Sequence, residues 1–226
     1  MKPLLVIFKP RNIPETDKAY SKIRGISKLW IKYYPQPDAY DLARQFFISS
    51  EYTHFIILPD DLIATQNDVD TISNYDEAID SISGWCNHTG TDDIYKYSNI
   101  SWFTPFNPPS QATFESYNWM TIGEIESLLS VVHDDLHVFP NDRTDCIQVG
   151  HQGFALTRLS RKIVEKIPFR TSAGCCVDSC LSLDLLKEKM PQYVDLKVRM
   201  NHLKIPRTEL LVGKEEPVMM FENCRE

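Results

Sequence analysis

The chain has 226 residues, and its 31 acidic residues outnumber its 24 lysines and arginines, which gives a formal net charge of −7. Proteins that grip nucleic acid need surplus positive charge to displace the counterions of the phosphate backbone, so this composition argues against that class. With 42% hydrophobic and 24% charged residues, the chain resembles an ordinary globular protein. We therefore treat residues 1–226 as a single domain, and expect any anionic ligand to be small or bridged by a metal ion.

No stretch of the sequence approaches the roughly 20 apolar residues that cross a membrane. The N-terminus also lacks the apolar run of a signal peptide. These patterns predict a cytoplasmic protein without a transmembrane segment. The six cysteines are expected to be free thiols, because a chain of this length can bury a core without disulfides.

The N-terminal part alternates short apolar runs with helical patterns. Residues 4–8, 30–34 and 53–58 are apolar runs typical of buried strands, whereas 13–26 and 37–50 have the spacing and starting residues of helices. This alternation predicts an α/β fold with a mostly parallel sheet covered by helices. In such sheets ligands bind beyond the carboxyl ends of the strands.

The rest of the chain is less regular. Residues 90–118 are rich in Tyr, Ser, Asn and Pro, which indicates a long loop or a set of short irregular strands, and long loops in compact domains often carry function. The other patterns predict strands at 82–87, 148–156 and 193–198, ordered structure at 122–132, and helices from 66 to 75 or 79, at 160–166 and at 178–189.

Two adjacent carboxylates, Asp60 and Asp61, follow the third apolar run directly. Neighbouring carboxylates at the end of a buried strand repel each other, so a divalent cation is a natural partner. A bound Mg²⁺ or Mn²⁺ would also let an acidic protein hold a diphosphate. Taken alone, the pair is more simply explained as the cap of the following helix.

Residues 52–62, which end in Leu-Pro-Asp-Asp-Leu, resemble the metal-binding DxD segment of GT-A-type nucleotide-sugar glycosyltransferases, especially family-2 enzymes. The resemblance implies that Asp61 binds the Mn²⁺ or Mg²⁺ that holds the diphosphate of the donor, with Asp60 next to the donor. Pro59 stands where many relatives have the first acid. A domain that binds nucleotide sugar with little or no catalysis is therefore an alternative.

The resemblance also implies a fold and an activity. The fold would be GT-A-like (Rossmann-like), a mostly parallel central sheet flanked by helices, with a smaller acceptor-side sheet or loop region. The donor half would span about residues 1–90 and the acceptor half about 91–210. The activity would be metal-dependent transfer of a sugar, with inversion, from a nucleotide-diphosphate sugar to a hydroxyl of a carbohydrate, lipid or protein acceptor. A UDP-sugar is the expected donor.

Three further segments match the family in the same order. Residues 149–158 resemble the glycine-flanked strand beneath the acceptor site, where Gly150 and Gly153 would allow close approach of a sugar, although two such glycines also relieve a strand bulge. Asp178 matches the acid that serves as general base in inverting enzymes, but a carboxylate at a helix start is equally well a cap. His202 matches a histidine that adds a metal ligand or contacts the donor phosphate, and is otherwise a surface residue.

The resemblance assigns further residues to the two substrates. Lys9 and Arg11 follow the first strand, where relatives contact the base, ribose or phosphate, and Asp38 could reach the same part of the donor. The simpler interpretations are a basic surface turn and the start of a helix. Trp85 and Trp102 are candidates for stacking on an acceptor sugar, or for packing the loop region onto the sheet.

The cysteines suggest a different kind of protein. A zinc-stabilised interaction module is possible, although adjacent cysteines followed by a four-residue step do not form the usual C-x-x-C pair. Buried free thiols explain the same residues. The candidate zinc ligands are Cys175, Cys176 and Cys180 with His202, or with His133 and His137.

Overall fold

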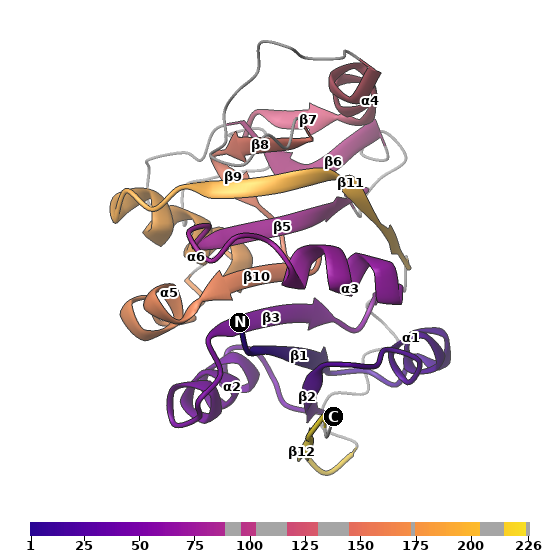
Figure 1. Cartoon of the computed structure of the whole chain (residues 1–226), viewed down its shortest axis with the longest axis vertical. Coiled ribbons are helices and arrows are strands. Elements are labelled where there is room, and N and C mark those ends of the chain that lie inside the picture. The colour runs from indigo at the N-terminus through magenta and orange to yellow at the C-terminus, as the bar shows by residue number, and fades with distance from the viewer. Residues whose placement is uncertain (89–95, 103–116, 131–144, 173–174, 204–214, 225–226) are drawn as a thin grey trace.

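The computed structural model describes residues 1–88, 96–102, 117–130, 145–172, 175–203 and 215–224 (Figure 1). Two sheets and six helices make up this part of the chain. The nine-stranded main sheet contains β1 (Pro3–Lys9), β2 (Ser27–Lys32), β3 (His54–Pro59), β4 (Leu62–Ile63), β5 (Ser81–Cys86), β8 (Cys146–Val149), β10 (Thr157–Ser160), β11 (Gln192–His202) and β12 (Val218–Glu222). The second sheet contains β6 (Tyr97–Ser101), β7 (Trp119–Thr121) and β9 (His151–Gln152). The helices are α1 (Pro14–Tyr20), α2 (Asp38–Ile48), α3 (Gln66–Ser73), α4 (Ile122–Ser130), α5 (Arg161–Lys166) and α6 (Val177–Lys187).

The main sheet is mixed, with the strand order β12-β2-β1-β3-β10-β5-β11-β4 and with β8 also paired to β11. Three of its pairs are parallel, β1 with β2, β1 with β3, and β5 with β11. The other five pairs are antiparallel. The expectation of a mostly parallel, GT-A-like (Rossmann-like) central sheet is therefore wrong. It extended the strand-helix-strand pattern of the N-terminal part to the whole chain, whereas β4, β8, β10 and β12 are short strands that run the other way.

The first strand shows how the sheet builds its core. Alternate residues of β1 point to opposite faces, so Leu4, Val6 and Phe8 join one buried cluster while Leu5 and Ile7 join another. Helices α2, α5 and α6 cover the first face, and α1 and α3 cover the second (Figure 1). A third cluster packs α4 and the small sheet against β5, β8 and β11. Burial on both faces explains why β1 is a continuous apolar run.

Local sequence features determine where the helices near the N-terminus begin. Helix α1 begins with Pro14, whose missing N–H costs nothing at a helix start. Helix α3 begins with a capping box, in which the Thr65 side chain accepts the N–H of Asp68 and the Asp68 carboxylate accepts the N–H of Thr65. Gly25, with a φ of 73°, lies between α1 and β2 and adopts a conformation that other residues rarely take.

Five strands of the main sheet run in one direction. Because β10 is antiparallel to both β3 and β5, these two strands share the direction of β1, β2 and β11. Their carboxyl ends therefore lie along one edge of the sheet. Asp60 and Asp61 follow β3, Asn87 and His88 follow β5, and His202 ends β11.

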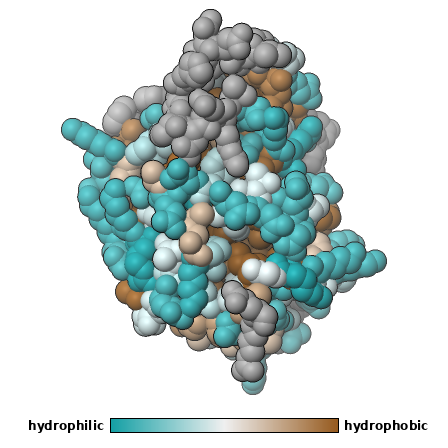
Figure 2. Space-filling model, viewed as in Figure 1, coloured by the Kyte–Doolittle hydropathy of each residue, from teal (hydrophilic) through white to brown (hydrophobic). Residues whose placement is uncertain are grey.

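The surface is mainly polar. The face in Figure 2 is largely hydrophilic, with small hydrophobic areas between polar side chains. On the outermost strand, β12, four apolar side chains are exposed, those of Val218, Met219, Met220 and Phe221. None of the helices in the described ranges is both long and apolar enough to cross a membrane.

Candidate functional site

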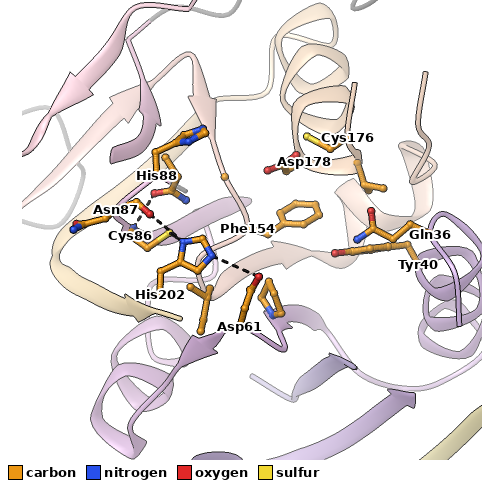
Figure 3. Close-up of a pocket in the computed structure, with 15 residues that line it drawn as sticks. Gln36, Tyr40, Asp61, Cys86, Asn87, His88, Phe154, Cys176, Asp178 and His202 are labelled. Atoms are coloured by element: carbon orange, nitrogen blue, oxygen red, sulfur yellow. Dashed lines mark hydrogen bonds and ion pairs between the residues drawn. The ribbon is translucent and has the colours of Figure 1, made fainter. Parts of the chain in front are cut away.

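A cleft of about 310 Å³ lies at the edge formed by the carboxyl ends of β3, β5 and β11 (Figure 3). Four of the predicted site residues line it, Asp61, Gly153, Asp178 and His202. They come from four separate segments of the chain. The fold thus brings the proposed metal-binding and base residues to one place.

The two adjacent aspartates have different environments. Asp60 is 3% exposed, and its carboxylate accepts hydrogen bonds from the Arg11 backbone N–H (3.1 Å), Nε (3.0 Å) and Nη2 (2.6 Å). Burial raises the pKa of Asp60, and the Arg11 guanidinium opposes that rise. Asp60 therefore faces Arg11 and does not line the cleft among the described residues. Asp61 also accepts a bond from Arg11 Nη2, at 2.8 Å.

Asp61 forms its second contact with His202. The Nε2 atom of His202 lies 3.5 Å from Oδ2 of Asp61, and its Nδ1–H donates to the carbonyl oxygen of Asn87 at 3.0 Å (Figure 3). Burial alone would raise the pKa of Asp61, but hydrogen bonds from His202 and Arg11 bring it below its usual value. Burial lowers the pKa of His202 and the bond to Asp61 raises it, with a net rise to about 10. As it stands, the pair is an ion pair of imidazolium and carboxylate.

Asp61 and His202 could together bind a divalent ion once the imidazole has lost its proton. A histidine that donates its other N–H to a backbone carbonyl has the fixed ring orientation of metal-binding histidines. Within the described ranges, no group of three His, Cys, Asp or Glu side chains is arranged to hold a metal ion. Asp61 and His202 would thus supply two ligands, and a bound phosphate and water would have to supply the rest.

Asp178 faces the cleft from the side opposite to Asp61 (Figure 3). It lies in the first turn of α6, and its Oδ1 accepts the backbone N–H of Ser179 at 2.8 Å. The N-cap of this helix is Cys176, whose side chain makes no capping hydrogen bond. Asp178 is thus not the N-cap residue, and its half-buried side chain lines the cleft.

Two aromatic residues that the sequence did not single out form part of the wall. The Tyr40 ring stacks on Phe8, with centroids 4.0 Å apart, and its centroid lies 5.6 Å from that of Phe154. Both Tyr40 and Phe154 line the cleft. Burial holds the pKa of Tyr40 well above its usual value, so its hydroxyl stays protonated. Tyr40 falls in the predicted helix at 37–50, on the face that carries Ala39 and Ala43 into the core.

Further lining residues follow β5 and precede α6. Asn87 and His88 come directly after the strand, and Cys176 comes just before the helix. The sequence interpretation assigned no donor or acceptor role to any of the three. Asn87 and His88 had a usable signal, because polar residues directly after a buried strand lie at the edge where ligands bind.

Several predicted contact residues lie elsewhere. Lys9 is 3% exposed and forms an ion pair with Asp17. Asp38 is exposed in the first turn of α2. Neither lines the cleft among the described residues. The sequence placed them there because they follow or precede strands, and it could not show which way their side chains turn.

The two tryptophans proposed for acceptor stacking also differ from expectation. Trp85 is 2% exposed in the third core cluster, and its indole N–H donates to the carbonyl oxygen of Leu196 at 2.7 Å. Its ring therefore offers no open face to a sugar, and the stacking role assigned to it does not fit this structure. Trp102 is 38% exposed but does not line the cleft in the part of the chain described here.

The two predicted glycines have different surroundings. A Cβ on Gly153 would lie 2.5 Å from Nδ2 of Asn99, so this glycine allows the close approach of a neighbouring side chain. Gly150 donates its N–H to the carbonyl oxygen of Ser101 at 3.0 Å, and its carbonyl accepts Nε2 of Gln192 at 3.0 Å. Of the two, only Gly153 lines the cleft.

The candidate zinc ligands do not form a site in the described part of the chain. The six cysteines are free thiols in this structure. Cys176 lines the cleft, whereas Cys180 is buried in α6. His133 and His137 lie outside the described residues.

No protein-family model matches the sequence, and no curated protein has significant similarity to it. Among solved structures, the crystal structure of A197 from STIV is similar, with a TM-score of 0.51 and 12% sequence identity. The similarity covers 91% of this chain and 96% of that chain. At this identity it concerns the fold alone, and shows that this arrangement of elements occurs in another protein.

Proposed function

We propose that the protein is a metal-dependent glycosyltransferase that moves a sugar from a nucleotide-diphosphate sugar, with UDP as the expected nucleotide, to an acceptor hydroxyl. The observation that carries the proposal is the arrangement of Asp61 and His202 on one side of a cleft and Asp178 on the other. A location in the cytoplasm, where cysteines stay reduced, is part of the proposal and agrees with the six free thiols.

The charges of the cleft favour a cation as part of the ligand set. Its fifteen described lining residues include two aspartates and no lysine or arginine. Arg11 lies close by, but its guanidinium is already bound to Asp60 and Asp61. Because Arg11 and His202 already balance the charge of Asp61, the cleft has no positive charge left for a diphosphate. A divalent ion bound by Asp61 and His202, with loss of the imidazole proton, would supply that charge.

The proposed roles follow from these positions. Asp61 and His202 hold Mn²⁺ or Mg²⁺, which when bound supplies positive charge next to the leaving diphosphate. Asp178 accepts the proton of the acceptor hydroxyl, whose oxygen attacks the anomeric carbon from the face opposite to the leaving group. One C–O bond forms as another breaks, and the configuration inverts. Phe154, which is partly buried, gives the sugar an apolar surface to lie against, and the buried Tyr40 ring packs beside it.

A binding assay and a transfer assay test the proposal together. We expect UDP to bind in the presence of Mn²⁺ in isothermal titration, and one of a panel of UDP-sugars to release UDP on incubation. Asp61→Asn and His202→Gln should weaken binding, whereas Asp178→Asn should keep binding and lose turnover. Asp70→Asn, an exposed carboxylate on α3 outside the cleft, serves as the control. Failure of UDP and other nucleoside diphosphates to bind with Mn²⁺ would overturn the proposal.

A second candidate is a domain that binds nucleotide sugar without transferring the sugar. It is favoured by the sequence Pro59-Asp60-Asp61, in which Pro59 replaces an acid and Asp60 is held by Arg11, so that one carboxylate of the motif lines the cleft. The same experiment separates the two candidates. Tight Mn²⁺-dependent UDP binding, with no UDP released from any donor in the panel, would support the binding domain.

A further inference from the structure

His151 lies buried directly behind the first turn of α6. It is 2% exposed in β9, and its Nε2 atom lies 3.2 Å from Oγ of Ser179, within hydrogen-bond distance. The rings of Tyr117 and Trp119 pack against the imidazole nearly edge to face, with centroids 5.3 and 5.4 Å away. The side chain is therefore held on several sides.

Strand β9 binds α6 through polar contacts as well as by packing. Besides the bond between His151 and Ser179, the Ser182 hydroxyl donates to the carbonyl oxygen of Gln152 at 3.3 Å. Ser179 and Ser182 are three residues apart, so they lie on the same face of the helix. The N-cap residue of α6 makes no side-chain capping hydrogen bond, so these two contacts help to orient the start of the helix against the sheet, together with the bond from Nε2 of Gln192 to the carbonyl oxygen of Ser182 at 3.1 Å.

Ser179 connects the buried histidine to the cleft. Its hydroxyl contacts His151, and its backbone N–H donates to Oδ1 of Asp178 at 2.8 Å. Burial lowers the pKa of His151, so the imidazole is neutral at physiological pH and forms an ordinary hydrogen bond with the hydroxyl. A shift of the first turn would move the Asp178 carboxylate with it.

We propose that His151 is a positioning residue, which holds the first turn of α6 through Ser179 and thereby fixes the orientation of the Asp178 carboxylate in the cleft. The inference rests on the proposed function, in which Asp178 takes the proton of the acceptor hydroxyl. It assigns a role to a residue of the Gly150-to-Gly153 segment that touches neither substrate. A displacement of about 1 Å at a reacting group can lower a rate roughly a hundredfold.

Three substitutions isolate the contact. His151→Phe removes the hydrogen bond from the side of the histidine. Ser179→Ala removes it from the side of the helix, together with the contact between Ser179 Oγ and Sγ of Cys176 at 3.4 Å. Ser182→Ala is the matched control, because it removes the other hydrogen bond between α6 and β9, one turn further along the helix. We expect the first two to lower kcat for transfer roughly tenfold to a hundredfold, with the Kd for UDP and Mn²⁺ unchanged, and Ser182→Ala to leave kcat near that of the wild type.

The double variant distinguishes positioning from general loosening. If His151 acts through Ser179, then His151→Phe combined with Ser179→Ala should lower kcat no further than Ser179→Ala alone. His151→Gln, which keeps a polar group near the position of Nε2, should restore part of the rate. Multiplicative losses in the double variant, or an equal loss in Ser182→Ala, would overturn the inference.

Crystal structures of the Ser179→Ala and Ser182→Ala variants give a readout that does not depend on activity. We expect the Asp178 carboxylate to be displaced or present in alternative conformers in the first, and unchanged in the second. An unmoved Asp178 in Ser179→Ala would refute the inference whether or not the protein transfers sugar. Full turnover by Asp178→Asn would instead refute the proposed function, and the crystallographic comparison would still decide the role of His151.

Discussion

Replacing Arg11 by methionine should destabilise the protein mainly through its effect on Asp60. The guanidinium gives two of its hydrogen bonds to Asp60, at 3.0 and 2.6 Å, and one to Asp61, at 2.8 Å. The Arg11 and Asp60 side chains are 12% and 4% exposed. Methionine keeps most of the aliphatic volume but leaves a buried carboxylate without its cation, which typically costs about 3–5 kcal/mol.

A second substitution tests whether the unpaired charge causes this loss. With asparagine at position 60 there is no buried charge, so Arg11→Met combined with Asp60→Asn should be more stable at pH 7 than Arg11→Met alone. The pH dependence has a definite sign. Burial already raises the pKa of Asp60, and without Arg11 to oppose it that pKa rises further. The folded variant therefore binds a proton more readily than the unfolded chain, and its deficit should shrink as the pH falls through the raised pKa.

Guanidinium denaturation of the wild type, both single variants and the double variant, at pH 7 and pH 5, measures these free energies of unfolding. Tryptophan fluorescence is a suitable signal, because Trp30 and Trp85 are buried. If Arg11→Met lowered the free energy of unfolding by less than about 1 kcal/mol, the contact would contribute no more than an exposed ion pair. Equal losses in Arg11→Met and the double variant, with no recovery at pH 5, would refute the argument that Asp60 is the source.

Two further predictions use the same denaturation assay. Burial and the charge of Arg158 lower the pKa of His54 from 6.5 to about 4. The unfolded chain therefore binds a proton at His54 below about pH 6.5 while the folded protein does not, and the free energy of unfolding decreases as the pH falls from 6.5 toward 4. Between pH 7 and pH 5 the wild type should lose about 2 kcal/mol more than His54→Gln; identical pH profiles would show that His54 does not carry this dependence. Gly84→Ala should cost about 1–3 kcal/mol, because its Cβ would lie 2.7 Å from the carbonyl oxygen of Val198. Gly123 lies in α4, and no atom lies within 4 Å of the position that its Cβ would take, so Gly123→Ala should stabilise the protein by about 0.5 kcal/mol. A loss of stability of equal size in both variants would contradict this steric argument.

The long strands of the fold could be predicted from the sequence, whereas most short ones could not. Strands β1 and β3 are continuous apolar runs because both of their faces are buried, and such runs are visible in a sequence. Strand β10 has the sequence Thr-Arg-Leu-Ser, with all four residues buried. Arg158 at its centre is fully buried and donates to the carbonyl oxygens of Tyr75, Asp76 and Ile79. A hydropathy pattern cannot identify this central strand, because the carbonyl oxygens that bind its buried arginine belong to a distant part of the chain.

The site was predictable to the extent that it depends on strand ends. Asp61 follows β3 and His202 ends β11, and these two strands run in the same direction. Their positions at strand ends were therefore enough to predict that the two residues lie close together, as they do. Side-chain direction was not predictable. Trp85 is a large aromatic residue in a strand whether it faces the core or a ligand, and only the structure, through its burial and its bond to the Leu196 carbonyl, shows that it faces the core. The local sequence also gave no indication that Arg11 contacts two aspartates about fifty residues away.

The mixed sheet explains how a site expected from a parallel sheet arises without one. One antiparallel strand, β10, lies between β3 and β5, and inserting a single antiparallel strand leaves its two neighbours pointing the same way. Strand β11 then joins β5 in parallel. The residues after β3 and β5 and the last residue of β11 thus reach the same edge, where Asp61, Asn87 and His202 are in contact. The shared direction of the contributing strands, and not the parallel pairing of neighbours, is what assembles the cleft.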